Sequence, residues 1–148
     1  MTITHARLGD TVTFSKTVGE ADVYLFAGIT GDFSPNHVNE QFMQGTAYGR
    51  RIVHGALLVG FMSTASARMQ AGSIERGIDT TPVSLGYDGL RFLKPVFFGD
   101  TVTVHYKISA IDEERARTVA DMEVTNQHGE LVSVGKHITK WVSNEARL

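Results

Sequence analysis

The chain has 148 residues and a formal net charge of −2 at neutral pH. This length suits one domain with its own hydrophobic core, which we expect to span residues 1–148. The slight negative charge argues against nucleic-acid binding, which needs a basic surface. The chain has no cysteine, so disulfides, thiolate nucleophiles and cysteine-ligated metals are excluded. No apolar stretch of signal-peptide length opens the chain, and we expect a cytoplasmic protein.

The first half of the chain carries two helical patterns. Residues 21–30 place one set of side chains at the i, i+3, i+4, i+7 spacing of an amphipathic helix: Val23, Phe26, Ala27 and Thr30. Two pairs could cap the start of this helix, either Thr17 with Glu20 or Gly19 with Asp22. A helix that packs on one face is therefore expected here.

The second helical pattern covers residues 52–70, IVHGALLVGFMSTASARMQ. No Asp, Glu, Lys or Arg occurs between Arg51 and Arg68, and the stretch is apolar nearly all round up to Met62. Such a helix is buried on most sides. It falls short of the roughly 20 apolar residues that cross a bilayer, so we expect a core helix and no membrane association.

The second half predicts strands. Residues 101–110 and 117–125 alternate apolar and polar side chains, the period of a half-buried strand. The apolar sets are Val102, Val104, Tyr106 and Ile108 in the first, and Thr118, Ala120, Met122 and Val124 in the second. Residues 131–142 and 82–93 are two further, less regular candidates. Antiparallel strands that follow grouped helices predict an α+β fold in which a sheet curls around one helix.

The stretch GDFSPNHVN, residues 31–39, places an acid and an imidazole on either side of a proline. Pro35 disfavours a helical conformation at Ser34, so we expect an extended chain between Asp32 and His37. This could bring both side chains to one side of a loop. Taken alone, the spacing favours a simpler interpretation, in which Asp32 caps or turns the chain and His37 is a solvated loop histidine.

Three ordered blocks together narrow the choice: FAGITGDFSPNHVNEQF, GRRIVHGALLVGFMS and RFLKPVFFGDTVTV. In this order they closely resemble the MaoC-like dehydratases, which include the (R)-specific enoyl-CoA hydratases. The resemblance covers nearly the whole chain. It implies a hot-dog fold, in which the sheet wraps a helix that starts near His54. It also implies a homodimer, or an assembly of dimers, whose sheets join edge to edge.

The resemblance further implies that Asp32 and His37 are the catalytic pair, because they match the family pattern D-x-N-P-x-H. This chain has Ser34 where asparagine is usual and Asn39 where aspartate is common. Neither departure removes an acid–base group. The resemblance also implies that the Gly55 N–H stabilises the thioester oxygen, and that Ser63 lies near the substrate.

Hydration of an α,β-unsaturated thioester gives these residue types a chemical purpose. A base must activate water, and an acid must deliver a proton to the α-carbon; an Asp and a His that hold one water can share both tasks. Backbone N–H groups at a helix start stabilise the charge that develops on the thioester oxygen. For Gly55, close helix–sheet packing is an equally valid reason. We expect His54 to order the loop rather than react.

Alternative functions remain open at this point. A 3-hydroxyacyl-ACP dehydratase has the same chemistry on another carrier, and a non-catalytic acyl-thioester module has the same fold. Hot-dog thioesterases resemble one another in carrying a carboxylate on the central helix. Here the first is Glu75, beyond the expected helix end. We expect an acyl-CoA or acyl-ACP substrate, no metal and no redox cofactor. CoA phosphates could contact several basic residues: Arg50, Arg51, Arg68, Arg91 and Lys94.

Overall fold

The computed structural model describes residues 6–77 and 79–145; the rest of the expected 1–148 domain lies outside this description. These described residues form four helices and five strands. In order they are β1 (Thr11–Thr17), α1 (Glu20–Thr30), α2 (Pro35–Val38), α3 (Glu40–Gln44), α4 (Gly55–Glu75), β2 (Thr80–Phe92), β3 (Thr101–Asp112), β4 (Arg117–Thr125) and β5 (Leu131–Ser143).

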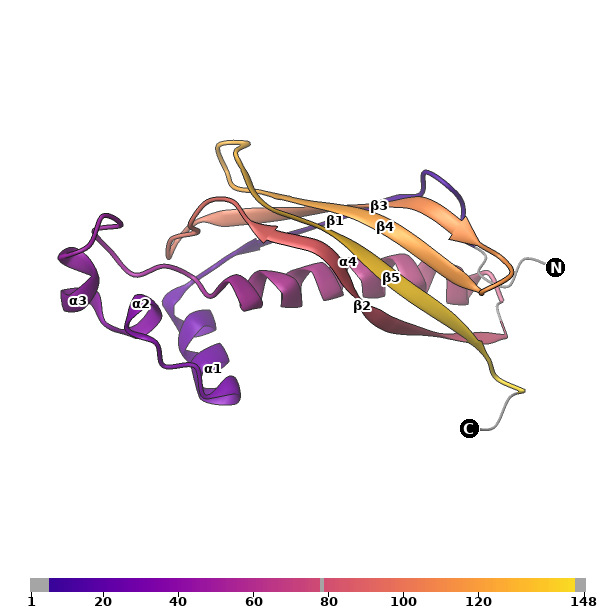
Figure 1. The fold of residues 1–148 in the computed structure, drawn as a ribbon, viewed down its shortest axis with the longest axis horizontal. Helices are drawn as coiled ribbons and strands as arrows, with labels where there is room; N and C mark the ends of the chain where they lie inside the picture. The colour runs from indigo at the N-terminus through magenta and orange to yellow at the C-terminus, as the bar shows by residue number, and fades with distance from the viewer. Residues whose placement is uncertain (1–5, 78, 146–148) are drawn as a thin grey trace.

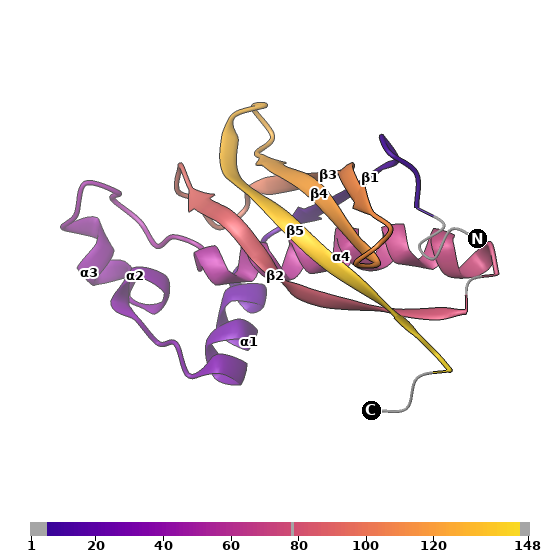
Figure 2. The same cartoon turned by 45° about the vertical axis from the view of Figure 1, so that its right-hand side comes forward.

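The strands form one five-stranded sheet in the order β1-β3-β4-β5-β2. Every neighbouring pair is antiparallel. The long helix α4 runs along the sheet and packs mainly against β1 and β3. The short helices α1, α2 and α3 gather beyond one end of the sheet, close to the start of α4 (Figure 1, Figure 2). The fold thus places the segment that contains Asp32 and His37 beside the first turn of α4.

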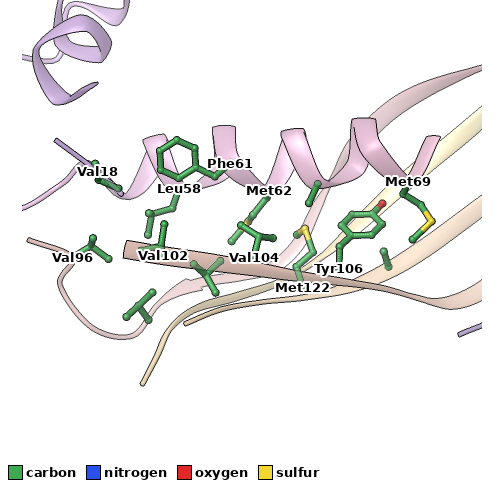
Figure 3. Close-up of a cluster of buried hydrophobic side chains, with 14 of the residues drawn as sticks. Val18, Leu58, Phe61, Met62, Met69, Val96, Val102, Val104, Tyr106 and Met122 are labelled. Atoms are coloured by element: carbon green, nitrogen blue, oxygen red, sulfur yellow. The ribbon is translucent and has the colours of Figure 1, made fainter. Parts of the chain in front are cut away.

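The core lies between α4 and the sheet, as the strand periodicity predicts. All four inward residues of β3 and all four of β4 are buried. Opposite them, the buried side chains of α4 include Leu58, Phe61, Met62, Ala65 and Met69. Figure 3 shows side chains from α4 and β3 pointing toward one another. The removal of this apolar surface from water stabilises the fold.

The structure corrects the expected bounds and burial of the long helix. It begins at Gly55, close to His54 as the resemblance implies but later than residue 52, and it continues to Glu75, beyond the expected end. Only one face is buried in the isolated chain, whereas burial on most sides was expected. The opposite face is formed by small, exposed residues, including Ala56, Gly60, Ser63 and Ala67.

Helix α1 matches its expected range with one added residue, Glu20. Of the two possible caps, Gly19 with Asp22 is the one formed, since the Gly19 N–H donates to the Asp22 carboxylate at 2.8 Å. Val23 and Ala27 are buried, while Thr30 is exposed, so the packed face is narrower than expected. Gly31 ends the helix in the left-handed region, at φ 82°.

Strand β1 lies in the half of the chain that the sequence reading assigned to helices. Its residues alternate between exposed and only partly buried positions. The alternation of apolar and polar residues in its sequence is correspondingly weak. Hydroxyl pairs tie it to β3, with Ser15 Oγ 2.8 Å from Thr103 and Thr17 2.6 Å from Thr101. Over the described part of the chain, no helix has the length and apolar character needed to cross a membrane.

Candidate active site

The segment from Gly31 to His37 turns sharply between α1 and α2. An Asp32 carboxylate oxygen accepts the Ser34 N–H at 3.2 Å, and Ser34 is extended, with φ −55° and ψ 137°. The expected extended chain stops there, because Pro35 is the first residue of α2 and His37 lies within this helix. Proline is tolerated at a first helical position, where its missing N–H would have no helical partner. The expectation of an extended chain as far as His37 was therefore wrong.

A backbone segment on the other side of the site, residues 51–54, holds this turn in place. The Ile52 N–H donates to the Asn36 carbonyl at 2.9 Å, and the Val53 N–H donates to the Val96 carbonyl at 2.7 Å. The Ile52 carbonyl lies 2.7 Å from Nδ1 of His37. Because a carbonyl oxygen only accepts hydrogen bonds, Nδ1 carries a proton. The neutral imidazole of His37 therefore presents Nε2 as an unprotonated base.

His54 contacts both members of the expected pair. Its ring stacks on His37, with centroids 3.8 Å apart and planes inclined by 27°. Its Nε2 donates to the Asp32 carbonyl at 3.0 Å and lies 3.9 Å from the Asp32 carboxylate. The side chain is only 1% exposed, and Nδ1 has no partner among the described residues. His54 thus orders the loop, as expected, and also supports the His37 ring directly.

The surroundings of His37 favour its neutral form. Partial burial is the main cause that lowers the pKa of His37 below its ordinary value of 6.5, and the neighbouring His54 lowers it further. The Ile52 carbonyl and Asp32 act in the opposite direction without cancelling this effect. Asp32 keeps about half of its side-chain surface exposed, at 48%. The site thus combines an accessible carboxylate with a neutral imidazole.

One ligand atom from each of Asp32, His37 and His54 lies within 4.8 Å of the other two. A water that hydrogen-bonds to two groups sits about 2.8 Å from each, so these atoms are close enough for one water to bridge Asp32 and His37. Two histidines and a carboxylate can also bind a metal. Here, however, Nδ1 of His37 and Nε2 of His54 each face a backbone carbonyl, at 2.7 and 3.0 Å, so one nitrogen of each ring is already engaged within the protein.

A cavity of about 270 Å³ brings His37 together with Gly55. Its walls also include Tyr48, Phe92 and Lys94. A Cβ atom at Gly55 would lie 2.8 Å from the Phe92 ring, so close packing against the strand is one reason for glycine there. Gly55 is also the first residue of α4, where backbone N–H groups lack helical acceptors. This position suits a donor to a bound oxygen.

Two of the expected site residues, Asp32 and Ser63, are not among the residues that line this cavity. Ser63 sits eight positions after Gly55 on α4, or about 12 Å along the helix axis, and lies close to the Tyr87 hydroxyl, where it opposes the rise in pKa that burial causes. Sequence reasoning gave no role to Tyr48 or Phe92 in the site. Such wall residues come from distant segments, and no local motif marks them.

Arg51 was one of the candidate phosphate contacts, but its guanidinium is engaged within the protein. It pairs with Glu40 at 2.7 Å and Glu20 at 2.8 Å, and it also bonds the Tyr24 hydroxyl. Its side chain is only 16% exposed. Arg51 therefore ties α1 and α3 to the segment that leads into α4. This role supports the site indirectly.

Comparison with known proteins agrees with this geometry. A family model described as a MaoC-like domain matches residues 4–131. An (R)-specific enoyl-CoA hydratase of Aeromonas caviae is 32% identical over 133 residues, which cover 90% of this chain and 93% of that protein. A 3-hydroxybutyryl-CoA dehydratase of Methylorubrum extorquens is 34% identical over 110 residues, covering 74% of this chain and 65% of that protein.

Solved structures confirm the hot-dog fold. The (R)-hydratase from A. caviae involved in PHA biosynthesis superposes with a TM-score of 0.79 at 32% identity, covering 91% of this chain and 96% of that chain. Protein af1124 from Archaeoglobus fulgidus gives a TM-score of 0.78 at 29% identity, covering 92% and 79% respectively. The chain belongs to the MaoC-like domain family.

Proposed function

We propose that this protein is a hydro-lyase that adds water to trans-2-enoyl-CoA thioesters to give (R)-3-hydroxyacyl-CoA, or catalyses the reverse dehydration. The observation that carries the proposal is the short distance between the Asp32 carboxylate and the His37 imidazole: one carboxylate oxygen and one ring nitrogen lie within 4.8 Å of each other. The names of the curated relatives, an (R)-specific enoyl-CoA hydratase and a 3-hydroxybutyryl-CoA dehydratase, support the same reaction and the CoA carrier.

In the proposed reaction, Asp32 and Nε2 of His37 hold one water between them. The water oxygen forms a bond to C3 of the substrate while one of its protons passes to the catalytic pair. A proton then returns from the pair to C2, so the thioester gains one water in total. The Ile52 carbonyl, 2.7 Å from Nδ1 of His37, keeps Nε2 directed toward the water. It also favours the imidazolium while His37 holds the extra proton.

The thioester oxygen gains negative charge as water adds, and we assign the Gly55 N–H to this oxygen. Gly55 begins a helix of 21 residues, whose N-cap side chain makes no capping hydrogen bond. The first N–H groups and the helix dipole are therefore available to an oxyanion. Because His37 and Gly55 line the same cavity, one bound thioester could contact both.

Two alternative reactions are less favoured by the site. A thioesterase would need a carboxylate on α4 beside the thioester. Glu75 is the first carboxylate on α4 and lies at its far end, about 30 Å from Gly55. A non-catalytic acyl-thioester module would have no use for a base and an acid held by separate hydrogen bonds. An ACP-linked dehydratase would use the same chemistry on another carrier. The positions of Arg50 and Lys94 help to choose between CoA and ACP.

Arg50 and Lys94 line a second cavity of about 270 Å³, which adjoins the first at Lys94 and Pro95. The Arg50 guanidinium lies over the Phe97 ring, 3.9 Å from its centroid. Lys94 pairs with Glu130 at 2.6 Å on the protein surface. We place the CoA phosphates toward this second cavity, where exposed cations can reach them.

We also propose that the protein forms a dimer through the edge of β2. This strand has 13 residues and, among the described strands, pairs only with β5. Exposed apolar side chains lie along and just after it: Val83, Leu85, Phe92 and Leu93. A long apolar edge invites pairing with another strand. A second copy would cover it, together with the small exposed residues of α4.

The reaction is tested by incubating the protein with crotonyl-CoA and longer trans-2-enoyl-CoA esters. Loss of the enoyl absorbance should accompany formation of the (R)-3-hydroxyacyl product, identified by chiral chromatography. Thiol release, followed in parallel with a thiol reagent, should stay far slower than hydration. A mainly (S) product, or thiol release that outpaces hydration, would contradict the proposed reaction.

Substitutions at the catalytic pair should remove activity without unfolding the protein. Asp32→Asn and His37→Gln should each lower kcat by about 10² to 10⁴, the usual contribution of general acid–base groups. If the two residues act as one unit, the double variant should be little worse than the poorer single variant. His105→Gln, on an exposed strand position, is the matched control. Near-normal kcat in folded Asp32→Asn would leave Asp32 as a turn residue only.

His54 should act as a positioning residue, and two variants separate its contacts. His54→Gln keeps an N–H for the Asp32 carbonyl, while His54→Phe keeps an aromatic ring against His37. Because kcat/KM requires neutral His37, it should fall as the pH drops through the lowered pKa, below 6.5. Both variants remove the electrostatic effect of His54 that lowers the pKa of His37, so this acid limb should move to higher pH.

We expect kcat to fall by about 10- to 100-fold in both His54 variants, because small displacements of reacting groups have effects of this size. A purely structural role would instead lower the melting temperature and leave the pH profile of the folded fraction unchanged. That result would show that His54 does not position the catalytic pair.

Light scattering at micromolar concentration tests the dimer. The unmodified protein should have at least twice the mass of one chain. Val83→Lys places a charge on the β2 edge and should shift the equilibrium toward monomer. Thr13→Lys, on the opposite edge strand β1, is the control and should not. An unmodified protein that is monomeric and fully active would refute the proposed dimer.

A further inference from the structure

A cluster of polar side chains lies within the mainly apolar layer between α4 and the sheet. His137 is only 1% exposed, and each of its two ring nitrogens has a hydrogen-bond partner. Its Nε2 lies 2.8 Å from the Ser84 hydroxyl, and its Nδ1 lies 2.9 Å from the hydroxyl of Tyr106, itself 2% exposed. Buried polar groups of this kind are costly unless they are hydrogen-bonded, and here they bond to one another.

The cluster extends from the core to the surface of the isolated chain. The Tyr87 ring stacks on His137, with centroids 4.8 Å apart. Burial raises the pKa of Tyr87, and the Ser84 and Ser63 side chains lie close enough to its hydroxyl to oppose this effect. Tyr87 is partly buried, whereas Ser63 and Ser84 are exposed. Three hydroxyl groups, from Ser63, Ser84 and Tyr87, therefore meet where α4 and β2 face each other.

This meeting point lies at one end of a seam that begins at the candidate active site. At the start of the seam, Phe92 of β2 packs against Gly55 of α4; at the other end, Tyr87 contacts Ser63. Strand β2 thus runs opposite to α4 along this stretch (Figure 1). Since α4 packs mainly against β1 and β3, its side toward β2 is the less covered one. An acyl chain that leaves the thioester at Gly55 could follow this seam.

The length of the seam limits the acyl chain. Gly55 and Ser63 are separated by about 12 Å along the helix axis. A hydrogen bond of about 3 Å at each end leaves about 6 Å between the thioester carbon and the polar end of the chain. This distance corresponds to about four or five bonds of about 1.5 Å each. An oxygen on C5 of the acyl chain would meet the hydroxyl groups.

We propose that this polar cluster recognises an uncharged oxygen substituent, a hydroxyl or a carbonyl, on the acyl chain of a short enoyl thioester. The inference rests on the proposed function and extends it to the substrate class. Hydroxyl groups can both donate and accept, so Ser63, Ser84 and Tyr87 suit either substituent. An unsubstituted chain would displace water from these hydroxyls without replacing its hydrogen bonds, which is unfavourable.

The cluster is less suited to a carboxylate. Its described members are hydroxyl groups and the imidazole of His137, and none of them is a fixed cation. Burial lowers the pKa of His137 to about 4, so this imidazole is neutral near pH 7. A carboxylate brought here would lose hydration without gaining a paired positive charge.

Three thioesters of similar length test the inference: trans-2-hexenoyl-CoA, 5-hydroxy-trans-2-hexenoyl-CoA as separate epimers, and trans-2-pentenedioyl-CoA, which ends in a carboxylate. For the unmodified protein, kcat/KM should be about tenfold higher with one hydroxylated epimer than with the unsubstituted chain, the size of effect expected for one well-placed hydrogen bond. The carboxylate substrate should be the poorest of the three.

Tyr87→Phe and Ser84→Ala should each reduce this tenfold preference toward one. Ser109→Ala, which removes a hydroxyl that bonds Asp121 elsewhere on the sheet, is the matched control and should keep it. The preference of the unmodified protein tests the inference even if a variant fails to fold. Equal kcat/KM with all three substrates, or a preference for the unsubstituted or carboxylate chain, would overturn this inference but not the proposed reaction. Hydration of none of them would overturn the proposed reaction as well.

Discussion

Residues 51–54 form the connection on which the candidate site depends. Arg51 holds α1 and α3 through Glu20 and Glu40, and the backbone of Ile52 and Val53 bonds to the turn on one side and to the strand connection on the other. His54 then contacts Asp32 and His37 together. The short helices beyond the sheet would otherwise have few contacts with it. This connection fixes the distance between the two groups that we propose to share one water.

Much of the fold could be predicted from the sequence because burial follows simple periods in β3 and β4. Their inward residues alternate strictly, and all of them are buried. Strand β1 escaped prediction because its partly buried side includes Lys16, and no residue in the strand is fully buried. The burial of α4 was overestimated because its outer face is formed by small residues. The absence of charge among them suggests burial, yet they are exposed in the part of the chain that the structure describes.

The site was predictable only where its residues are close in sequence. Asp32 and His37 share one short stretch, and the resemblance to a known family gave them roles. The stacking of His54 on His37 and the contact of Phe92 with Gly55 join residues far apart in the chain, and no local pattern indicates them. His137 lies in one of the expected strands, residues 131–142, but no local pattern indicates its environment, which is set by Ser84 and Tyr106 on two other strands.

The seam between α4 and β2 has a consequence for how this protein could diverge. The residues that line its far end, such as Tyr87 and Ser84, belong to β2 and contact His137 of β5, far from residues 51–54 and from the turn at Asp32. Substitutions well separated in a structure tend to act independently. Selection could therefore replace the hydroxyl groups with apolar side chains, or lengthen the accepted chain, while leaving the acid–base geometry unchanged. Related enzymes with different acyl preferences could arise from few mutations along one strand.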